Sequence, residues 1–133
     1  MPELTMFMVC SKVEKVRYLG QDGMRITGPM LAPRISKVPT VASFDVVFGL
    51  LGVPPDVSVI ITTRFISPSH RVVFQSVGEH KTPNPGGRLQ YYAGVIGRIN
   101  VWDVEIPEEG EYLFEISCGD TLIKRMPIPI FIG

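Results

Sequence analysis

Hydrophobic and polar residues alternate with a period of two along most of the chain, and turn-forming residues break the alternation at strand-length intervals. Strands that bury one face produce this pattern. The expected strands cover residues 4–13, 24–36, 41–53, 57–67, 72–77, 89–106, 111–117 and 122–132, with 89–106 as one long or two short strands. The sequence therefore predicts an all-β fold, in which residues 1–133 form a single antiparallel β-sandwich of about 7–9 strands.

The end of the chain indicates which kind of sandwich to expect. In residues 111–117, Tyr112, Phe114 and Ile116 share one face of the expected strand. The sequence Cys-Gly-Asp-Thr at residues 118–121 then forms a tight turn into the last strand. A final hairpin of this kind is the usual end of an immunoglobulin-like β-sandwich. We therefore expect an immunoglobulin-like fold.

The last expected strand contains two prolines. Pro127 and Pro129 are two residues apart, so both missing N–H groups fall on the same side of the strand. A strand that lacks two donors on one side pairs poorly there, which predicts an edge strand. The other parity is apolar and is expected to face the core through Leu122, Met126, Ile128, Ile130 and Ile132.

Two segments have a less regular pattern. Residues 24–36 alternate but contain Gly28, Pro29 and Pro33, which predicts a kinked strand or an edge strand. Residues 41–51 also fit a helical stripe, although their β-branched and aromatic content favours a strand. The sequence leaves both structures open for this segment.

Composition adds a question about self-association. The chain has 133 residues, of which 45% are hydrophobic and 20% are charged. A domain of this size buries about two-thirds of its unfolded surface, so it needs no metal ion or disulfide to stay folded. The hydrophobic share is slightly above that of an average soluble domain. It indicates either a well-filled core or an apolar face used in self-association.

The charge pattern argues against two classes of partner. Thirteen basic and thirteen acidic residues give a formal net charge of zero, so we expect neither a nucleic-acid partner nor attraction to a membrane surface. No segment has the run of about eighteen apolar residues that a membrane helix needs. The start of the sequence also lacks the pattern of a signal peptide. A cytoplasmic location is therefore expected.

The two cysteines fit a reducing compartment. Cys10 shares its parity with Met6 and Met8, and Cys118 shares its parity with Phe114. Both cysteines are therefore expected to be small buried hydrophobic side chains. A disulfide between them requires that the first and the penultimate strands be neighbours, and a reducing cytosol disfavours it.

The order of segments resembles a family of small uncharacterised prokaryotic β-sandwich proteins. The resemblance rests on RITGPMLAPRISKVP at 25–39, FDVVFGLLGVPPDVSVIITTRFISP at 44–68 and VEIPEEGEYLFEISCGDTLI at 104–123. The chain departs from it at SPSHR, residues 67–71, where a turn with Asp and Gly is more typical. The resemblance implies a fold, and it implies no activity and no catalytic residue.

The sequence lacks the motifs of common catalytic chemistry. It has no Gly-X-Ser-X-Gly for an activated serine, and NPGGR at 84–88 lacks the Lys-Ser/Thr of a phosphate-binding loop. His70 and His80 are the candidate metal ligands, but a strand between them would hold them roughly 30 Å apart. We therefore expect no catalytic residue, no metal site within one chain and no cofactor, and the protein is not expected to be an enzyme.

Recognition is expected to use the loops between strands. Residues 78–88 contain two prolines and three glycines and predict a long loop. One ring of the neighbouring tyrosine pair must point outward, where it can contact a partner. Trp102, in contrast, is expected to pack in the core. The candidate binding residues are His70, Arg71, His80, Lys81, Asn84, Arg88, Tyr91 and Tyr92.

These observations favour a non-catalytic binding or assembly module that recognises a protein partner through inter-strand loops. A homodimer is its expected resting state. Two alternatives stay open. The first is an enzyme that holds a metal or a small ligand between protomers, using His70 or His80 from two chains. The second is a self-associating structural subunit, which the apolar excess suggests.

Overall fold

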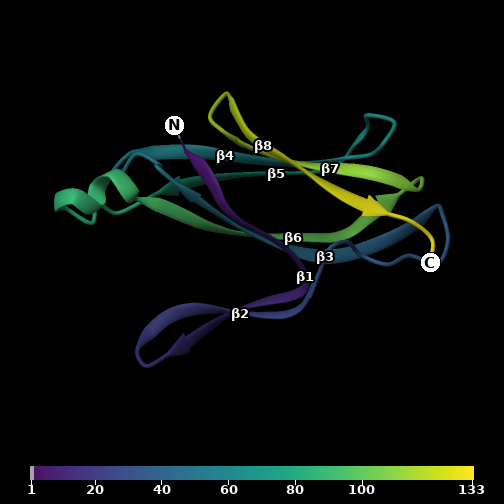
Figure 1. Cartoon of the computed structure of the whole chain (residues 1–133), viewed down its shortest axis with the longest axis horizontal. Helices are drawn as coiled ribbons and strands as arrows, with labels where there is room; N and C mark the ends of the chain where they lie inside the picture. The colour runs from purple at the N-terminus through teal and green to yellow at the C-terminus, as the bar shows by residue number, and fades with distance from the viewer. Residues whose placement is uncertain (1) are drawn as a thin grey trace.

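The computed structural model describes residues 2–133, except for the side chains of residues 90–92. In this part of the chain, eight strands form two four-stranded antiparallel sheets that pack as a sandwich (Figure 1). A short 3-10 helix, η1 (Gly87–Tyr92), precedes the sixth strand. The strands are β1 (Glu3–Tyr18), β2 (Gln21–Met30), β3 (Thr40–Leu51), β4 (Ser58–Ile66), β5 (Val72–Lys81), β6 (Gly94–Ile106), β7 (Gly110–Cys118) and β8 (Thr121–Ile130). The prediction of an all-β sandwich is confirmed.

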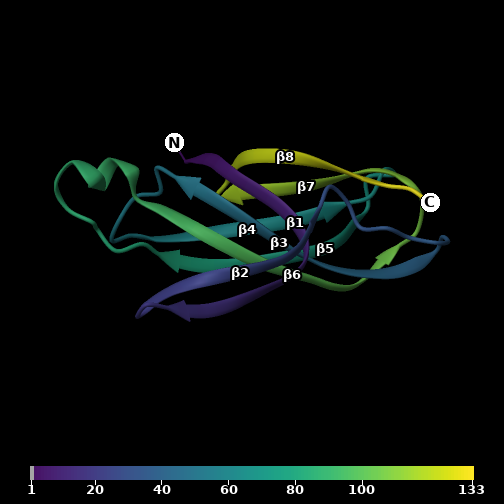
Figure 2. The same ribbon diagram turned by 60° about the horizontal axis from the view of Figure 1, so that its bottom comes forward.

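The core lies between the two sheets, which have the orders β2-β1-β3-β6 and β5-β4-β7-β8 (Figure 2). Alternate residues of each strand point into it, because neighbouring side chains of a strand point to opposite faces. Phe65 of β4 joins the two layers. Its ring centroid lies 5.5 Å from that of Phe44 in β3 and 5.1 Å from that of Tyr112 in β7. All three side chains are buried.

Residues 41–51 form a strand and not a helix. They belong to β3, which lies inside its sheet between β1 and β6. Residues 44–50 are buried on both faces of this strand, so apolar side chains occupy both parities. The resulting weak alternation explains why the sequence also fits a helical stripe. The edge position predicted for residues 24–36 is confirmed for residues 24–30, which belong to the edge strand β2, whereas residues 31–36 lie outside any strand.

β8 is an edge strand, as its two prolines predict. Ile128 and Ile130 are fully buried, and Met126 packs against the same core. The last residues of β8 therefore present an apolar face to the sandwich. The outer edge of the strand lacks two N–H donors, at Pro127 and Pro129.

Leu122 and Ile132, which the alternation of the last strand predicted to face the core, lie outside it. The β7–β8 register shifts between Ile116 and Ser117, and Ile123 is the extra residue of the resulting bulge. Because a bulge reverses the parity of the preceding residues, Ile123 packs against the core while Leu122 is 41% exposed. Ile132 lies beyond the end of β8 and is also exposed. The prediction was wrong for Leu122 and Ile132.

The expectation that Trp102 packs in the core is also wrong. The register of β3 and β6 shifts between Ala42 and Phe44, so Trp102 and Asp103 both lie opposite Ser43. Asp103 takes a left-handed φ of 53°, and its N–H donates to the Ser43 hydroxyl at 2.8 Å. This bulge turns Trp102 to the outer face, where its side chain is 61% exposed.

β5 is longer than the sequence pattern predicts. It pairs with β4 as far as Lys81, so residues 78–81 are strand and the predicted loop is wrong there. The loop is limited to residues 82–86 and leads into η1. Residues 89–92 belong to η1 instead of a strand, and β6 is one long strand from Gly94. Within the described residues, no helix has the length and hydropathy that crossing a membrane requires.

The two cysteines lie in different sheets, and both are free thiols. β1, which carries Cys10, pairs with β2 and β3, whereas β7, which carries Cys118, pairs with β4 and β8. Cys10 is fully buried, in a second apolar cluster with Val13 and Val47 outside the main core. Cys118 is only half-buried. The predicted burial is therefore confirmed for Cys10 and wrong for Cys118.

Candidate functional site

The predicted binding residues do not form one site. His70 and Arg71 lie in the connection between β4 and β5, at one end of β5. The opposite end carries His80, Lys81, Asn84 and Arg88. β5 runs between the two histidines, so they lie at opposite ends of one strand, as predicted. The side chains of Tyr91 and Tyr92 lie outside the described residues.

At the first end, polar side chains join the β4–β5 connection to the strand and turn that precede β7. The Ser69 hydroxyl donates to the Glu108 carboxylate at 2.8 Å. The Arg71 guanidinium lies 3.5 Å from the Glu105 carboxylate. His70 itself sits at a left-handed φ of 66° in the turn. These contacts link neighbouring segments at this end of the sandwich, and of the predicted binding residues they involve the side chain of Arg71.

At the second end, the side chains of Asn84 and His80 lie against nearby backbone. The Asn84 side-chain oxygen accepts a hydrogen bond from the Gly86 N–H at 2.8 Å. His80 is half-buried, and its Nε2 would lie 3.1 Å from a Cβ built on Gly78, so the imidazole covers this glycine. In the described part of the chain, no group of three His, Cys, Asp or Glu residues could hold a metal ion.

A concave surface lies elsewhere, beneath a protruding hairpin. β1 pairs with β3 only as far as Cys10 and continues to Tyr18 with β2 alone. The hairpin therefore extends beyond the sandwich, as both views of the fold show (Figures 1 and 2). Its two-residue turn, Leu19 and Gly20, has φ values of 50° and 77°, which suit the twist of a tight hairpin.

Asp45 fixes the point at which the hairpin leaves the sheet. Its carboxylate is buried and accepts the Val13 N–H at 2.8 Å through one oxygen. The other oxygen accepts the Asn100 amide and the Trp102 indole N–H, each at 2.9 Å. The carboxylate thus replaces the strand partner that β1 loses after Cys10. Three donors satisfy a charge that would otherwise be costly to bury.

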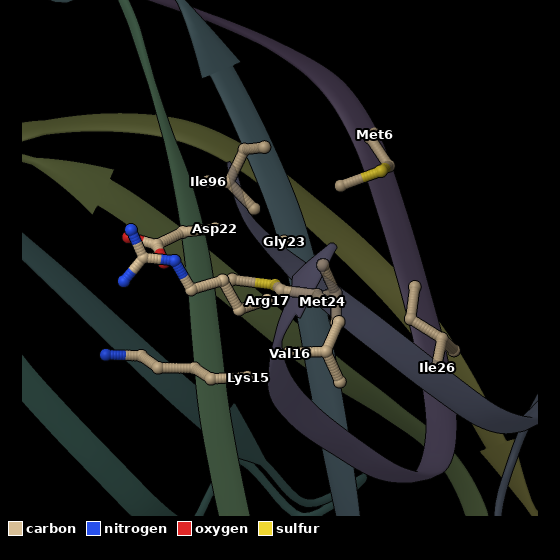
Figure 3. Close-up of a pocket in the computed structure, with 10 residues that line it drawn as sticks. Met6, Lys15, Val16, Arg17, Asp22, Gly23, Met24, Ile26 and Ile96 are labelled. Atoms are coloured by element: carbon tan, nitrogen blue, oxygen red, sulfur yellow. The ribbon is translucent and has the colours of Figure 1, made fainter. Parts of the chain in front are cut away.

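The twisted hairpin and the outer face of its sheet enclose a hollow of about 600 Å³, here called the hairpin groove. The sheet contributes Met6, Val47 and Ile96, from β1, β3 and β6. The hairpin contributes Lys15, Val16, Arg17, Asp22, Gly23, Met24 and Ile26. Figure 3 shows Met6, Ile96 and Met24 around the hollow, with the long side chains of Lys15 and Arg17 extending in a common direction.

Polarity changes along the hairpin. Val13 lies opposite Ile26, Lys15 opposite Met24, and Arg17 opposite Asp22 in the β1–β2 register. The apolar pair is therefore nearest the sheet and the charged pair is nearest the turn. A ligand in the groove would contact apolar side chains at the floor and charged side chains at the rim.

The groove has the size and the lining of a binding surface. Its volume falls in the range of small-ligand and side-chain pockets, and its methionines can adapt to irregular shapes. Its described lining residues include no His, Cys or Ser. Cys10 lies in the adjoining cluster, but burial, followed by the negative charge of Asp45, raises its pKa. A protonated thiol is a poor nucleophile, so Cys10 has low reactivity at this position.

A second hollow, of about 460 Å³, lies between the base of the hairpin and β8. It is lined by Phe7, Met8, Val9, Pro29, Met30, Leu31, Met126 and Pro127. All of these residues are apolar, so the second hollow offers no charge that could orient a ligand. The hairpin groove, which has both kinds of lining, is the stronger candidate site.

Comparison of the chain with known protein families, with curated proteins and with solved structures finds no match. The predicted resemblance to a family of prokaryotic sandwich proteins is thus supported only by the two-sheet architecture.

The sequence pattern does not reveal the hairpin groove, because β1 is apolar on both faces. Phe7 and Val9 enter the main core, whereas Met6 and Cys10 belong to the cluster on the outer face. The even-numbered positions of this strand therefore resemble core residues in the sequence, although Met6 lines the hairpin groove on the outer face of the sheet. The alternation also stops before the hairpin, because Val13 and Val16 are three positions apart, so the pattern does not indicate that the first strand continues to Tyr18.

Proposed function

We propose that this protein is a non-catalytic binding module that holds an apolar side chain of a protein partner in the hairpin groove. The observation that carries the proposal is an apolar hollow built from two structural units, the sheet and its hairpin, with charged residues at the rim. Ile96 on its floor is 62% exposed. Covering this apolar surface would stabilise a complex by about 25 cal/mol for each Å² removed from water.

The rim defines the chemistry of the partner. Lys15 and Arg17 outnumber Asp22, so the groove favours a carboxylate beside the apolar side chain. The partner segment we propose therefore carries Leu, Ile, Phe or Met next to Asp or Glu. The recognition surface is the outer face of a sheet, in place of the inter-strand loops that the sequence suggested.

We also propose that the scaffold is immunoglobulin-like. The order β1-β3-β6 corresponds to strands A, B and E of that fold, and β4-β7-β8 corresponds to C, F and G. β5 then corresponds to an additional C′ strand, and β2 is added beside strand A. Tyr112 in β7 supports the assignment, because its hydroxyl donates to the Glu108 carbonyl at 2.7 Å. Such a tyrosine corner is a hallmark at the start of strand F.

Peptide selection with methyl NMR tests the function. A random peptide library is selected on the wild-type protein, and the enriched peptides are titrated into protein labelled at the methionine methyl groups. We expect enriched peptides to combine an apolar side chain with an acidic neighbour and to shift the Met6 and Met24 signals. Met30 and Met126, which both line the second hollow, serve as internal controls.

Two matched variants make the test specific. Ile96→Glu places a charge on the groove floor, whereas Val41→Glu changes a side chain of nearly equal exposure, 60% against 62%, outside the groove. We expect Ile96→Glu to lose peptide binding and Val41→Glu to keep it, with equal melting temperatures. Peptides that bind both variants alike, or a metal ion or small molecule retained at unit stoichiometry in native mass spectrometry, would overturn the proposal.

A further inference from the structure

We propose that the outer edge of β5 pairs with β5 of a second copy of this chain, which joins two sandwiches through one continuous eight-stranded sheet. β5 pairs with β4 on one side and ends its sheet on the other. Its register with β4 is uninterrupted from Phe74 to Lys81. The exposed edge therefore offers a regular row of N–H and C=O groups, which is a template for another strand.

The other three sheet edges are blunted. β8 lacks the N–H groups of Pro127 and Pro129. β2 is interrupted by Gly28, with a left-handed φ of 63°, and by Pro29. β6 is kinked at Asp103, where φ is 53°. Among the four edge strands, β5 alone has neither a proline nor a residue with a left-handed φ. Its register shifts next to Val73, and from Phe74 to Lys81 its regular edge can accept a partner strand.

The composition of β5 points in the same direction. Residues 72–77, VVFQSV, contain no charge, no proline and no glycine. Val77 is 59% exposed in the middle of the strand, and Val72 is 46% exposed at its start. This uncharged segment has high β propensity and favours strand pairing, whereas Glu79 and Lys81 at the end of β5 disfavour unlimited addition of chains. A two-fold pair closes after two copies, because each edge then covers the other.

Antiparallel pairing about a two-fold axis at Val77 gives complementary contacts. Val77 would face its symmetry mate, and Gln75 would face Glu79 of the second copy on both sides of the axis. Side chains directly opposite in an antiparallel pair lie on the same face, with Cβ atoms about 5 Å apart. The glutamine amide can donate to the carboxylate, and no like charges are opposed. A second copy of this chain is therefore the occupant that fits.

The mass in solution tests this pairing. Native mass spectrometry and light scattering are applied to the wild-type protein, to Val77→Lys and to Val41→Lys. Val77 and Val41 have nearly equal exposure, 59% and 60%, but only Val77 lies on the β5 edge. We expect wild type and Val41→Lys at twice the chain mass of 14.8 kDa and Val77→Lys at the mass of one chain. Circular dichroism checks that all three fold alike.

Disulfide trapping gives a second readout that needs no destabilising change. Val77→Cys should form an intermolecular disulfide on oxidation, because the two Cβ atoms meet at the axis. Ile60→Cys, on the neighbouring strand β4, should not, because about 14 Å separates the two copies at three strand spacings.

A wild-type protein that stays monomeric at millimolar concentration, or a dimer that survives in Val77→Lys, overturns the pairing. Crosslinking of Ile60→Cys as readily as Val77→Cys overturns it as well. The pairing does not depend on the hairpin groove, which belongs to the other sheet. Loss of peptide binding in Ile96→Glu and loss of the dimer in Val77→Lys are therefore separate outcomes.

Discussion

The carboxylate of Asp45 accepts a hydrogen bond from the backbone N–H of Val13 at 2.8 Å, at the point where β1 leaves β3. This contact joins a buried residue of the sandwich to the first residues of the protruding hairpin. It therefore couples the stability of the sheet to the shape of the hairpin groove. A residue that touches no ligand thus positions the wall of the proposed binding surface.

Replacing Asp45 with Ala should destabilise the protein by about 3 kcal/mol, since three donors, of which the Val13 N–H is buried, would lose their acceptor. Chemical denaturation measures this free energy of unfolding. Asp22→Ala, at an exposed acidic residue of the hairpin, is the control and should change stability by less than about 0.5 kcal/mol. Equal stability of the two variants would contradict the role of Asp45.

Trp102→Ala should cost far less stability than removal of a core aromatic residue. Trp102 is 61% exposed and contributes one indole hydrogen bond to Asp45, so we expect a loss of about 1–2 kcal/mol. Phe65→Ala, which empties a fully buried position, should cost about 3–5 kcal/mol. Denaturant titration of both variants compares them. A larger loss for Trp102→Ala would show that the bulge in β6 does not place its ring outside.

Tyr112 should make the protein less stable at alkaline pH. Burial raises its pKa above the usual value of 10.0. Because the folded-state pKa is the higher one, this contribution to stability is complete below pH 10 and declines as pH rises toward the folded-state pKa. Unfolding free energies measured between neutral and alkaline pH should therefore fall less steeply in Tyr112→Phe than in wild type.

Tyr112→Phe should also lose about 1 kcal/mol at neutral pH, because the buried Glu108 contact is removed while the ring remains. A variant whose stability and pH slope both equal those of wild type would show that the hydroxyl contributes nothing to the fold.

Cys10 should react with iodoacetamide much more slowly than Cys118 in the folded protein. Cys10 is fully buried and its pKa is raised, so little thiolate is present near neutral pH, whereas Cys118 is partly accessible. Mass spectrometry of native and unfolded samples measures the two rates, and unfolding should make them similar. Faster native labelling of Cys10 would place it outside the second apolar cluster.

The sequence by itself determined the architecture, because period-two patterning and turn residues act locally. It identified the all-β sandwich, the final hairpin around Gly119 and the edge position of β8 from Pro127 and Pro129. It also placed His70 and His80 at opposite ends of one strand. Each of these features depends on residues that are close together in the chain.

Tertiary structure decided which face of each strand meets the core and where a binding surface forms. Bulges at Asp103 and Ile123 reverse parity, and their positions depend on registers between strands distant in sequence. The hairpin groove depends on the same kind of information, because Asp45, more than thirty residues after Val13, fixes where the hairpin diverges. Local alternation cannot encode a register or a divergence point, since both are set by contacts that exist only after the sheets have formed.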